Sequence, residues 1–332
     1  MSLHSRKEKH TLKYFIGLDG GGSKTRAVLV DCFTSRTIEE ITIDRGSNLS
    51  DSPEAVHVLY ELVVEIIEKS SVSNDSIIGI GIGVASSSNK KRREEAFQKF
   101  KSIGLSGKVI ILNDAEAAYE VCCLSKKQIL VTIGTGIICL ARGDGNKSVV
   151  TAGKGHHNGD IGSGYWIGNK LLISIAMRDN DVPYEDFQAC RELVCDFFSS
   201  SNIDNIIIDL GSDKDKVKKV ASIAKGVIGL AKDGNQLALN ILQEATFNVS
   251  EYIIQLADIL RLSKERIVLA GNGSIISSNF YRKLLNECLE FNFSEVIWTF
   301  SSIPASYGAC IVSARVNNKH LPLDKLIKGK DA

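Results

Sequence analysis

Apolar and polar positions follow one another in blocks that predict a regular order of strands and helices in the first half of the chain. Short β-branched runs predict strands, and apolar positions at helical spacing predict helices. The predicted elements are strands at 14–18, 26–31, 37–43, 77–84 and 108–112 and helices at 53–69, 91–102 and from about 115. The strand at 77–84 is apolar throughout, which predicts an inner strand covered on both faces.

The second half begins again with strands and continues with helices. The predicted elements are strands at 128–133, 137–142, 147–151, 266–270 and 295–298 and helices at 164–177, 184–199, 216–231, 236–262, 279–290 and from Pro304. Both halves therefore place hairpin strands first and helices with single strands afterwards. This shared order predicts an α/β fold of two related domains, each a mixed sheet flanked by helices, with a cleft between them.

A glycine-rich turn between two apolar runs occurs in each half. The first turn is Asp19-Gly-Gly-Gly-Ser-Lys-Thr25 and the second is Gly134-Thr-Gly136. Glycines let backbone N–H groups approach a phosphate closely, so two such hairpins favour a nucleoside triphosphate and a phosphotransferase. A P-loop does not fit the first turn, because a β-branched run follows it instead of a helix.

Composition narrows the class of protein. The chain has 332 residues and a formal net charge of +1, which gives no electrostatic reason for binding nucleic acid or a membrane. The polar stretch 1–13 is expected to be a disordered tail rather than a signal peptide, and the protein is expected in the cytoplasm. The eight cysteines contain no C-x-x-C pair and mostly lie in apolar runs, which favours buried free thiols over a metal site.

Five motifs occur in the order found in one family. They are Asp19-Gly-Gly-Gly-Ser-Lys-Thr, Asn113-Asp114, Gly134-Thr-Gly136, the Gly-Asp-x-Gly-Ser-Gly-Tyr-Trp-Ile-Gly segment at 159–168 and Ala270-Gly-Asn-Gly273. With them the chain resembles the N-acetylglucosamine kinase and BadF/BadG/BcrA/BcrD ATPase family of the actin-like, sugar-kinase superfamily. The resemblance implies two actin-like (ribonuclease H-like) ATPase domains, at 12–122 plus 308–326 and at 123–307. It also implies ATP, Mg²⁺ and a small-molecule sugar substrate, and leaves homodimerisation open.

The resemblance assigns phosphoryl-transfer roles to particular residues. Asp114 is the candidate general base, although by sequence alone it could instead cap the helix that follows. Asp19 is the candidate Mg²⁺ ligand, through water. The candidate phosphate contacts are Gly21, Gly22, Ser23, Lys24, Thr135 and Gly136. Lys24 could also be a solvated charge on the hairpin.

The sugar is assigned to Asn48 and to the segment containing Lys154, Gly155 and Asp160, with Asp160 accepting hydrogen bonds from sugar hydroxyls. Lys154 and Ile161 depart from the family, which typically has Trp and Glu at these positions. The phosphate half of the pattern is intact and the sugar half is altered. His156, His157 and Asp160 could form a metal cluster, but no fourth ligand is evident.

The adenosine is assigned to Ala231, Gly271 and Gly273, although the two glycines could simply form a strand-to-helix turn.

The resulting hypothesis is an ATP-dependent kinase of N-acetylglucosamine or a related amino sugar. Two other functions stay open. One is an ATPase that activates a 2-hydroxyacyl-CoA dehydratase, which needs cysteines for an iron–sulfur cluster, and the other is a non-catalytic sugar- or nucleotide-binding regulator.

Overall fold

The computed structural model describes residues 12–22, 24–49, 54–125, 127–143, 147–155, 160–177 and 182–328. The predicted N-terminal tail lies largely outside this part of the chain. The chain divides into two compact units, which are described separately. Unit 1 comprises 1–121 and 302–332, and unit 2 comprises 122–301.

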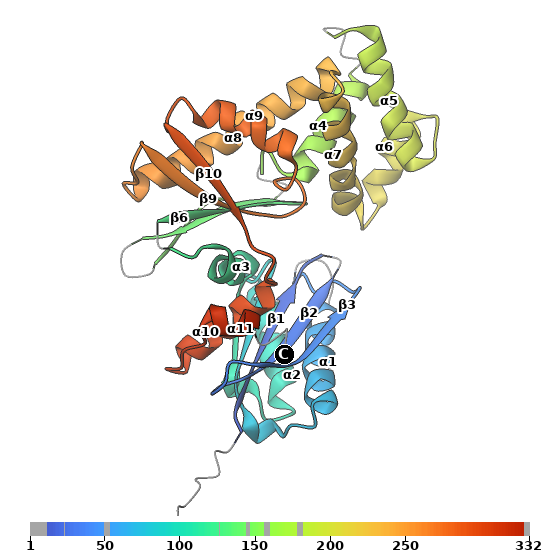
Figure 1. The fold of residues 1–332 in the computed structure, drawn as a ribbon. Coiled ribbons are helices and arrows are strands. Elements are labelled where there is room, and N and C mark those ends of the chain that lie inside the picture. The colour runs from blue at the N-terminus through green and yellow to red at the C-terminus, as the bar shows by residue number, and fades with distance from the viewer. Residues whose placement is uncertain are drawn as a thin grey trace, which may run out of the picture. The chain divides into compact units, whose positions relative to one another are not determined.

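Unit 1 is a five-stranded mixed sheet with helices on both faces (Figure 1). Its strands are β1 (Tyr14–Gly20), β2 (Thr25–Asp31), β3 (Thr37–Ile43), β4 (Ile77–Val84) and β5 (Val109–Asn113), in the order β3-β2-β1-β4-β5. The first three strands form an antiparallel meander, and β1, β4 and β5 run parallel. The helices are α1 (Glu54–Lys69), α2 (Lys90–Lys101), α3 (Asp114–Cys122), α10 (Ala305–Val316) and α11 (Leu323–Lys328), with short 3₁₀ turns at Asn74–Ser76 and Ser106–Lys108.

The two faces of β4 carry different residue types. Ile80 and Ile82 pack into the core that α1 and α2 cover, whereas Gly79 and Gly81 face α10. A Cβ on Gly81 would lie 2.0 Å from the carbonyl oxygen of Ala309, so α10 approaches the sheet backbone directly. The prediction of a strand covered on both faces is confirmed. Gly79 and Gly81 have no side chain, and this lets α10 pack directly on the strand.

Arg315 joins α10 to α3 within unit 1. Its two terminal nitrogens donate to the two carboxylate oxygens of Glu120, at 2.9 and 2.6 Å. Such a bidentate pair fixes orientation as well as distance. The C-terminal segment therefore holds the helix that begins at Asp114.

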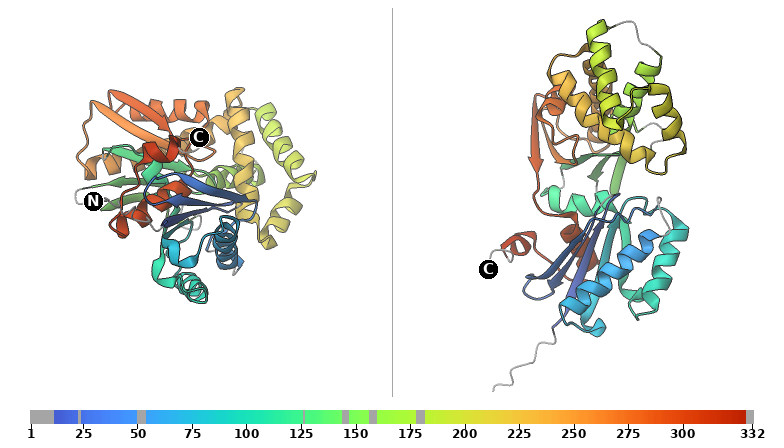
Figure 2. Two further views of the ribbon diagram at one scale, coloured as in Figure 1. Left: turned by 60° about the horizontal axis from the view of Figure 1, so that its bottom comes forward. Right: turned by 90° about the vertical axis from the view of Figure 1, so that its right-hand side faces the viewer.

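Unit 2 repeats the same sheet topology. Its strands are β6 (Gln128–Ile133), β7 (Ile137–Arg142), β8 (Ser148–Ala152), β9 (Arg266–Asn272) and β10 (Glu295–Phe300), in the order β10-β9-β6-β7-β8. Its helices are α4 (Gly164–Ala176), α5 (Tyr184–Phe198), α6 (Ile203–Ser212), α7 (Lys216–Lys232), α8 (Gln236–Ile259) and α9 (Asn279–Leu289). The segment from α4 to α7 forms a layer of helices to one side of the sheet (Figure 2).

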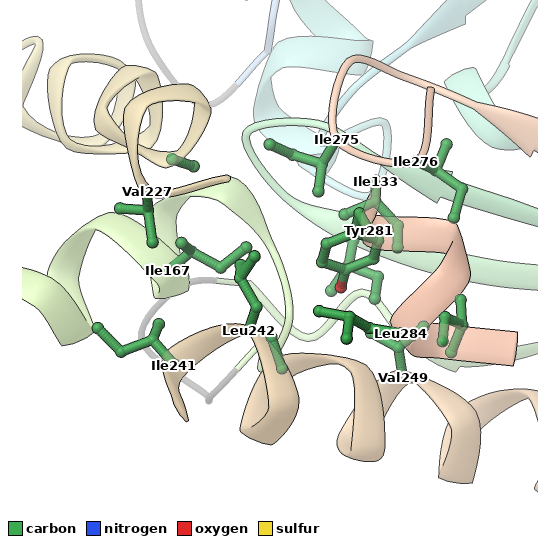
Figure 3. Packing of buried hydrophobic residues seen from close by; sticks show 14 of the residues in the cluster. Ile133, Ile167, Val227, Ile241, Leu242, Val249, Ile275, Ile276, Tyr281 and Leu284 are labelled. Carbon is green, nitrogen blue, oxygen red and sulfur yellow. The ribbon is translucent and has the colours of Figure 1, made fainter. Parts of the chain in front are cut away.

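The core of unit 2 is a continuous apolar cluster between the sheet, α4, α7, α8 and α9. Figure 3 shows Tyr281 of α9 among Ile133, Ile275 and Val249 at its centre. Tyr281 is fully buried, and its hydroxyl donates to the carbonyl oxygen of Gly162 at 3.2 Å. A polar group from the core thus holds the turn that precedes α4.

The predicted fold class of two mixed sheets flanked by helices is confirmed. Two helices were not predicted, α6 and α11. Asn202 caps α6 by accepting hydrogen bonds from the backbone of Asp204 and Asn205, and this asparagine before an apolar period was the available signal. All eight cysteines are free thiols. In the described part of the chain, no helix combines the length and apolar character required to cross a bilayer.

Candidate active site

Two carboxylates of unit 1 lie at the carboxyl ends of parallel strands, where α/β sheets bind ligands. Asp19 is the penultimate residue of β1, and Asp114 directly follows β5. β4 lies between these strands, with Gly83 paired to both Asp19 and Leu112. The two carboxylates are close enough to repel each other, since the charge of Asp114 contributes to the perturbed pKa of Asp19.

Burial perturbs both carboxylates. The pKa of Asp19 is raised from 3.8 to about 6, first by burial and then by the charge of Asp114, while Arg26 opposes the rise. The pKa of Asp114 is also raised, chiefly by burial. Among the described residues, no group donates a hydrogen bond to the carboxylate of Asp19. A carboxylate without a donor, repelled by a second one, favours a bound cation, so Asp19 fits the predicted Mg²⁺ role.

The cap of α3 is Asn113 rather than Asp114. Asn113 Oδ1 accepts a hydrogen bond from the backbone N–H of Ala115 at 2.9 Å, and Glu116 accepts from the N–H of Asn113 at 3.2 Å. This is a reciprocal capping box. Asp114 is the first helical residue; its Oδ1 shares the Ala115 N–H at 2.9 Å, and its Oδ2 has no partner in the described part of the chain.

The first hairpin and the loop carrying Asn48 are joined in unit 1. The turn closes with a hydrogen bond from the N–H of Gly21 to the carbonyl of Lys24 at 3.1 Å, and the N–H of Ser47 donates to Gly21 at 3.0 Å. Thr25 Oγ1 bonds to the carbonyl of Arg45 at 2.7 Å and lies 3.0 Å from Ser47 Oγ. The predicted sugar residue Asn48 therefore lies directly beside the predicted phosphate turn.

The remaining residues of the first turn differ in exposure. Gly22 is exposed, and a Cβ there would contact nothing. Lys24 is also exposed, with its Nζ 3.4 Å from Asp44, so it lies on the solvent side of the turn. Ser23 lies outside the described residues. The assignment of these residues to the phosphates stays a prediction.

The second hairpin tip is held by the first turn of α4. The N–H groups of Gly164 and Tyr165 donate to the carbonyls of Gly134 and Thr135, at 2.8 and 3.1 Å. Because C=O and N–H point in opposite directions across a trans peptide, the N–H groups of Thr135 and Gly136 both point away from α4. Neither has a hydrogen-bond partner in the described part of the chain. Two neighbouring N–H groups on one side form an anion-binding concavity.

Asp160 lies beside this hairpin. One of its carboxylate oxygens is 3.8 Å from the position of a Cβ on Gly136, and the other accepts a hydrogen bond from the N–H of Lys154 at 2.8 Å. Asp160 is buried, at 8% exposure, whereas Lys154 and Gly155 are exposed. The predicted sugar segment and the predicted phosphate hairpin thus come together in unit 2. His156 and His157 lie outside the described residues.

The three residues predicted at the adenosine differ in how they are covered. Ala231 is the penultimate residue of α7 with its side chain in the core, and Gly273 packs on the carbonyl of Ile133 with a φ of +101°. Gly271 lies under the ring of Phe300, which also contacts the Arg282 guanidinium at 4.7 Å. Gly271 therefore lies within β9 and Gly273 in the turn that follows it, and their contact with adenosine stays a prediction.

Two helix caps were not predicted from the sequence, although Asn113 and Ser163 both lie in motifs quoted above. Asn113 with Glu116 three residues later carries the N-x-x-E pattern of a capping box, which was the available signal. Ser163 caps α4 by accepting from the N–H of Trp166 at 3.1 Å, and its place just before an apolar helix was the second signal. No cluster of three or more metal-ligating side chains occurs among the residues that the structure describes.

Two comparisons with known protein sequences find relatives of this chain. The model of the BadF/BadG/BcrA/BcrD ATPase family matches residues 16–310. The N-acetylmuramic acid/N-acetylglucosamine kinase of Clostridium acetobutylicum is 28% identical over 303 residues, covering 91% of this chain and 98% of that protein. These two comparisons cover nearly the whole chain.

Solved structures share the fold. A Chromobacterium violaceum protein provisionally assigned as an N-acetylglucosamine kinase superposes with a TM-score of 0.71 at 18% identity, over 91% of this chain and 99% of that one. A ROK family glucokinase from Streptomyces griseus, in complex with glucose and AMPPNP, superposes with a TM-score of 0.56 at 17% identity, over 90% of this chain and 98% of that one. The family expected from the motifs is confirmed: the chain belongs to the BadF/BadG/BcrA/BcrD ATPase family.

Proposed function

We propose that this chain is an ATP-dependent kinase that phosphorylates a hydroxyl group of N-acetylglucosamine or a related amino sugar. The observation that carries the proposal is the pair Asp19 and Asp114 at the ends of β1 and β5, on either side of β4, with the loop of Asn48 bonded to the same edge. The relative from Clostridium acetobutylicum supports the choice of an amino sugar as acceptor.

Asp114 is the proposed general base. Its unpartnered Oδ2 accepts the proton of the attacking sugar hydroxyl as the oxygen bonds to the γ-phosphorus and ADP departs. A raised pKa suits this role, because a base works best when its pKa approaches the operating pH. The capping box of Asn113 and Glu116 leaves this carboxylate oxygen available.

The other residues bind and orient in this proposal. Asp19 holds Mg²⁺ through water, and the ion supplies charge neutralisation on the phosphates when bound. Gly21, Gly22, Ser23, Thr135 and Gly136 of the two hairpins contact the phosphates, to which the free N–H groups of Thr135 and Gly136 donate, and Lys24 adds charge. Asn48, Lys154, Gly155 and Asp160 orient the sugar, and Ala231, Gly271 and Gly273 contact the adenosine.

The experiment is ADP release with Mg·ATP in the presence of N-acetylglucosamine, glucosamine, N-acetylmannosamine, glucose, N-acetylmuramic acid or buffer alone. Asp114→Asn removes the base at constant shape and is expected to lower kcat by about 10²–10⁴. Glu68→Gln, at an exposed position of α1, is the matched control and keeps full activity. ADP release that is independent of any sugar would support an ATPase instead. Binding of sugar or nucleotide without ADP release would support a regulator.

A further inference from the structure

The loop after β4, residues 85–89, lies between the three unit 1 residues proposed to bind Mg²⁺, to orient the acceptor and to accept its proton, which are Asp19, Asn48 and Asp114. The N–H of Ala85 donates to the carbonyl of Gly20 at 3.3 Å, next to Asp19. Its carbonyl accepts from the N–H of Leu49 at 3.2 Å, next to Asn48. Val84, the last residue of β4, pairs with Asn113, next to Asp114. Ala85 therefore bonds to the chain neighbours of Asp19 and Asn48, and it follows the residue that pairs with the neighbour of Asp114.

Arg93 lies over this loop. Asn89 caps α2 through the N–H of Arg92 at 3.2 Å, and its side-chain amide donates to the carbonyl of Leu49 at 3.2 Å. Helical side chains lean toward the N-terminus of their helix, and the Arg93 guanidinium accordingly reaches back to the carbonyl of Ser87 at 3.4 Å. This places a positive charge two residues from Ala85.

Arg93 has no acidic partner within the described part of the chain. It is partly buried, and a guanidinium held partly out of water is costly without an anion. The neighbouring Arg92 differs, because it pairs with Glu95 at 2.5 Å. Ser87 as a residue is buried at 8% exposure, and no hydrogen-bond partner of its hydroxyl lies among the described residues.

The charge around Arg93 is unusual for a helix start. Residues 90–93 are Lys-Lys-Arg-Arg, and no acidic residue lies in the first turn of α2. Cations at this end oppose the helix dipole, so the position does not favour them for helix stability. An anion bound beside the loop would offset both this repulsion and the desolvation of Arg93.

We propose that Arg93 binds a carboxylate carried by the acceptor, so that the substrate class is acidic amino sugars. The inference rests on the proposed function, because it takes the acceptor to lie at this sheet edge. A guanidinium presents two parallel donors that match a carboxylate, which a lysine cannot do. Lys154 is a cation at a position where the family typically has an aromatic residue, and a cation there is consistent with an anionic acceptor.

The test uses three ligands. N-acetylmuramic acid carries a carboxylate on an ether substituent, its carboxamide is nearly isosteric but uncharged, and N-acetylglucosamine lacks the substituent. Calorimetry without nucleotide measures their dissociation constants for the wild type, for Arg93→Gln and for the control Arg92→Gln. Rates of ADP release measure kcat/KM for the same set.

In the wild type the acid is expected to bind more tightly than its amide by about tenfold or more. Arg93→Gln should lower this preference to near unity, in binding and in kcat/KM alike, while Arg92→Gln keeps it. A wild type without preference for the acid, or a preference that survives in Arg93→Gln, would overturn the inference. Preferential binding of the acid without ADP release from any sugar would instead reject the proposed kinase and leave the carboxylate site in place.

Discussion

The backbone N–H of Asn113 donates to the carboxylate of Glu116 at 3.2 Å, and this bond closes the capping box around Asp114. Asp114 thereby occupies the first helical position with one carboxylate oxygen unpartnered in the described part of the chain. The arrangement separates two tasks that an aspartate at a helix start can perform. Asn113 stabilises the helix, and Asp114 keeps a carboxylate oxygen available for the proposed proton transfer.

Replacing Asn113 by alanine tests the stabilising task. Asn113→Ala removes the acceptor for the N–H of Ala115 and is expected to cost about 1 kcal/mol of unfolding free energy. Asn113→Ser retains a capping oxygen and should recover most of that loss. Urea unfolding of both variants measures the difference. Equal stability of the alanine and serine variants would show that the cap contributes nothing.

Asp19 predicts how stability depends on pH. The folded state keeps the proton of Asp19 up to about pH 6, whereas the unfolded chain loses it near 3.8. The folded state thus binds more protons between these values, so this group makes stability fall as pH rises from 3.8 to about 6, with no further change above. The rise in pKa from 3.8 to about 6 corresponds to a difference on the order of 3 kcal/mol between the unfolding free energies below and above this pH range.

Asp19→Asn removes this pH-dependent contribution to the unfolding free energy. The metal-free variant is therefore expected to be more stable than wild type at pH 7 and equally stable near pH 3.5, as measured by urea unfolding across the range. The same substitution should weaken Mg²⁺-dependent nucleotide binding. A variant less stable than wild type at pH 7 would contradict the unfavourable ionisation of Asp19.

The contact of Gly81 with α10 predicts a severe effect of one methyl group. In Gly81→Ala the new Cβ would lie 2.0 Å from the carbonyl oxygen of Ala309, so the helix must move off the sheet. We expect a loss of about 3 kcal/mol from overpacking. Gly107→Ala is the control, because nothing lies within 4 Å of its Cβ position. A loss below 1 kcal/mol for Gly81→Ala, on the scale of a tolerated core change, would disprove the close approach.

The bond between α4 and the second hairpin predicts an effect on nucleotide binding. In Gly164→Ala the Cβ would lie 2.7 Å from the carbonyl of Gly134, which displaces the hairpin and turns the N–H groups of Thr135 and Gly136. The Kd for Mg·ATP is expected to rise about tenfold. Gly229→Ala in α7, with an open Cβ position, should leave that Kd unchanged. Calorimetric titration with the non-hydrolysable analogue AMPPNP compares the two.

The sequence predicts the strands and the glycine turns well because each depends on local pattern. The hairpin tips follow from glycines between β-branched runs, and the family follows from five motifs in order. The two faces of β4 could not be predicted, since Gly81 meets Ala309 from a helix more than 200 residues later in the chain. Local pattern carries no information about such a partner.

The same limit applies to the site. Asp160 was predicted to accept hydrogen bonds from sugar hydroxyls, but its burial and its bond to the N–H of Lys154 depend on the tertiary fold. The ring of Phe300 likewise covers Gly271 because β10 pairs with β9 in the folded sheet. Residue types that carry chemistry are visible in the sequence, whereas their accessibility is set by distant segments.

The position of α10 also has a consequence for synthesis on the ribosome. Unit 2 is one continuous segment, so all of its strands have emerged by residue 301. Unit 1 lacks the helix that covers β1 and β4 until residues 305–316 have left the exit tunnel. Its glycine-lined face stays open to water, or to chaperones, throughout the translation of unit 2. The first domain to begin in the nascent chain is therefore the last to be completed.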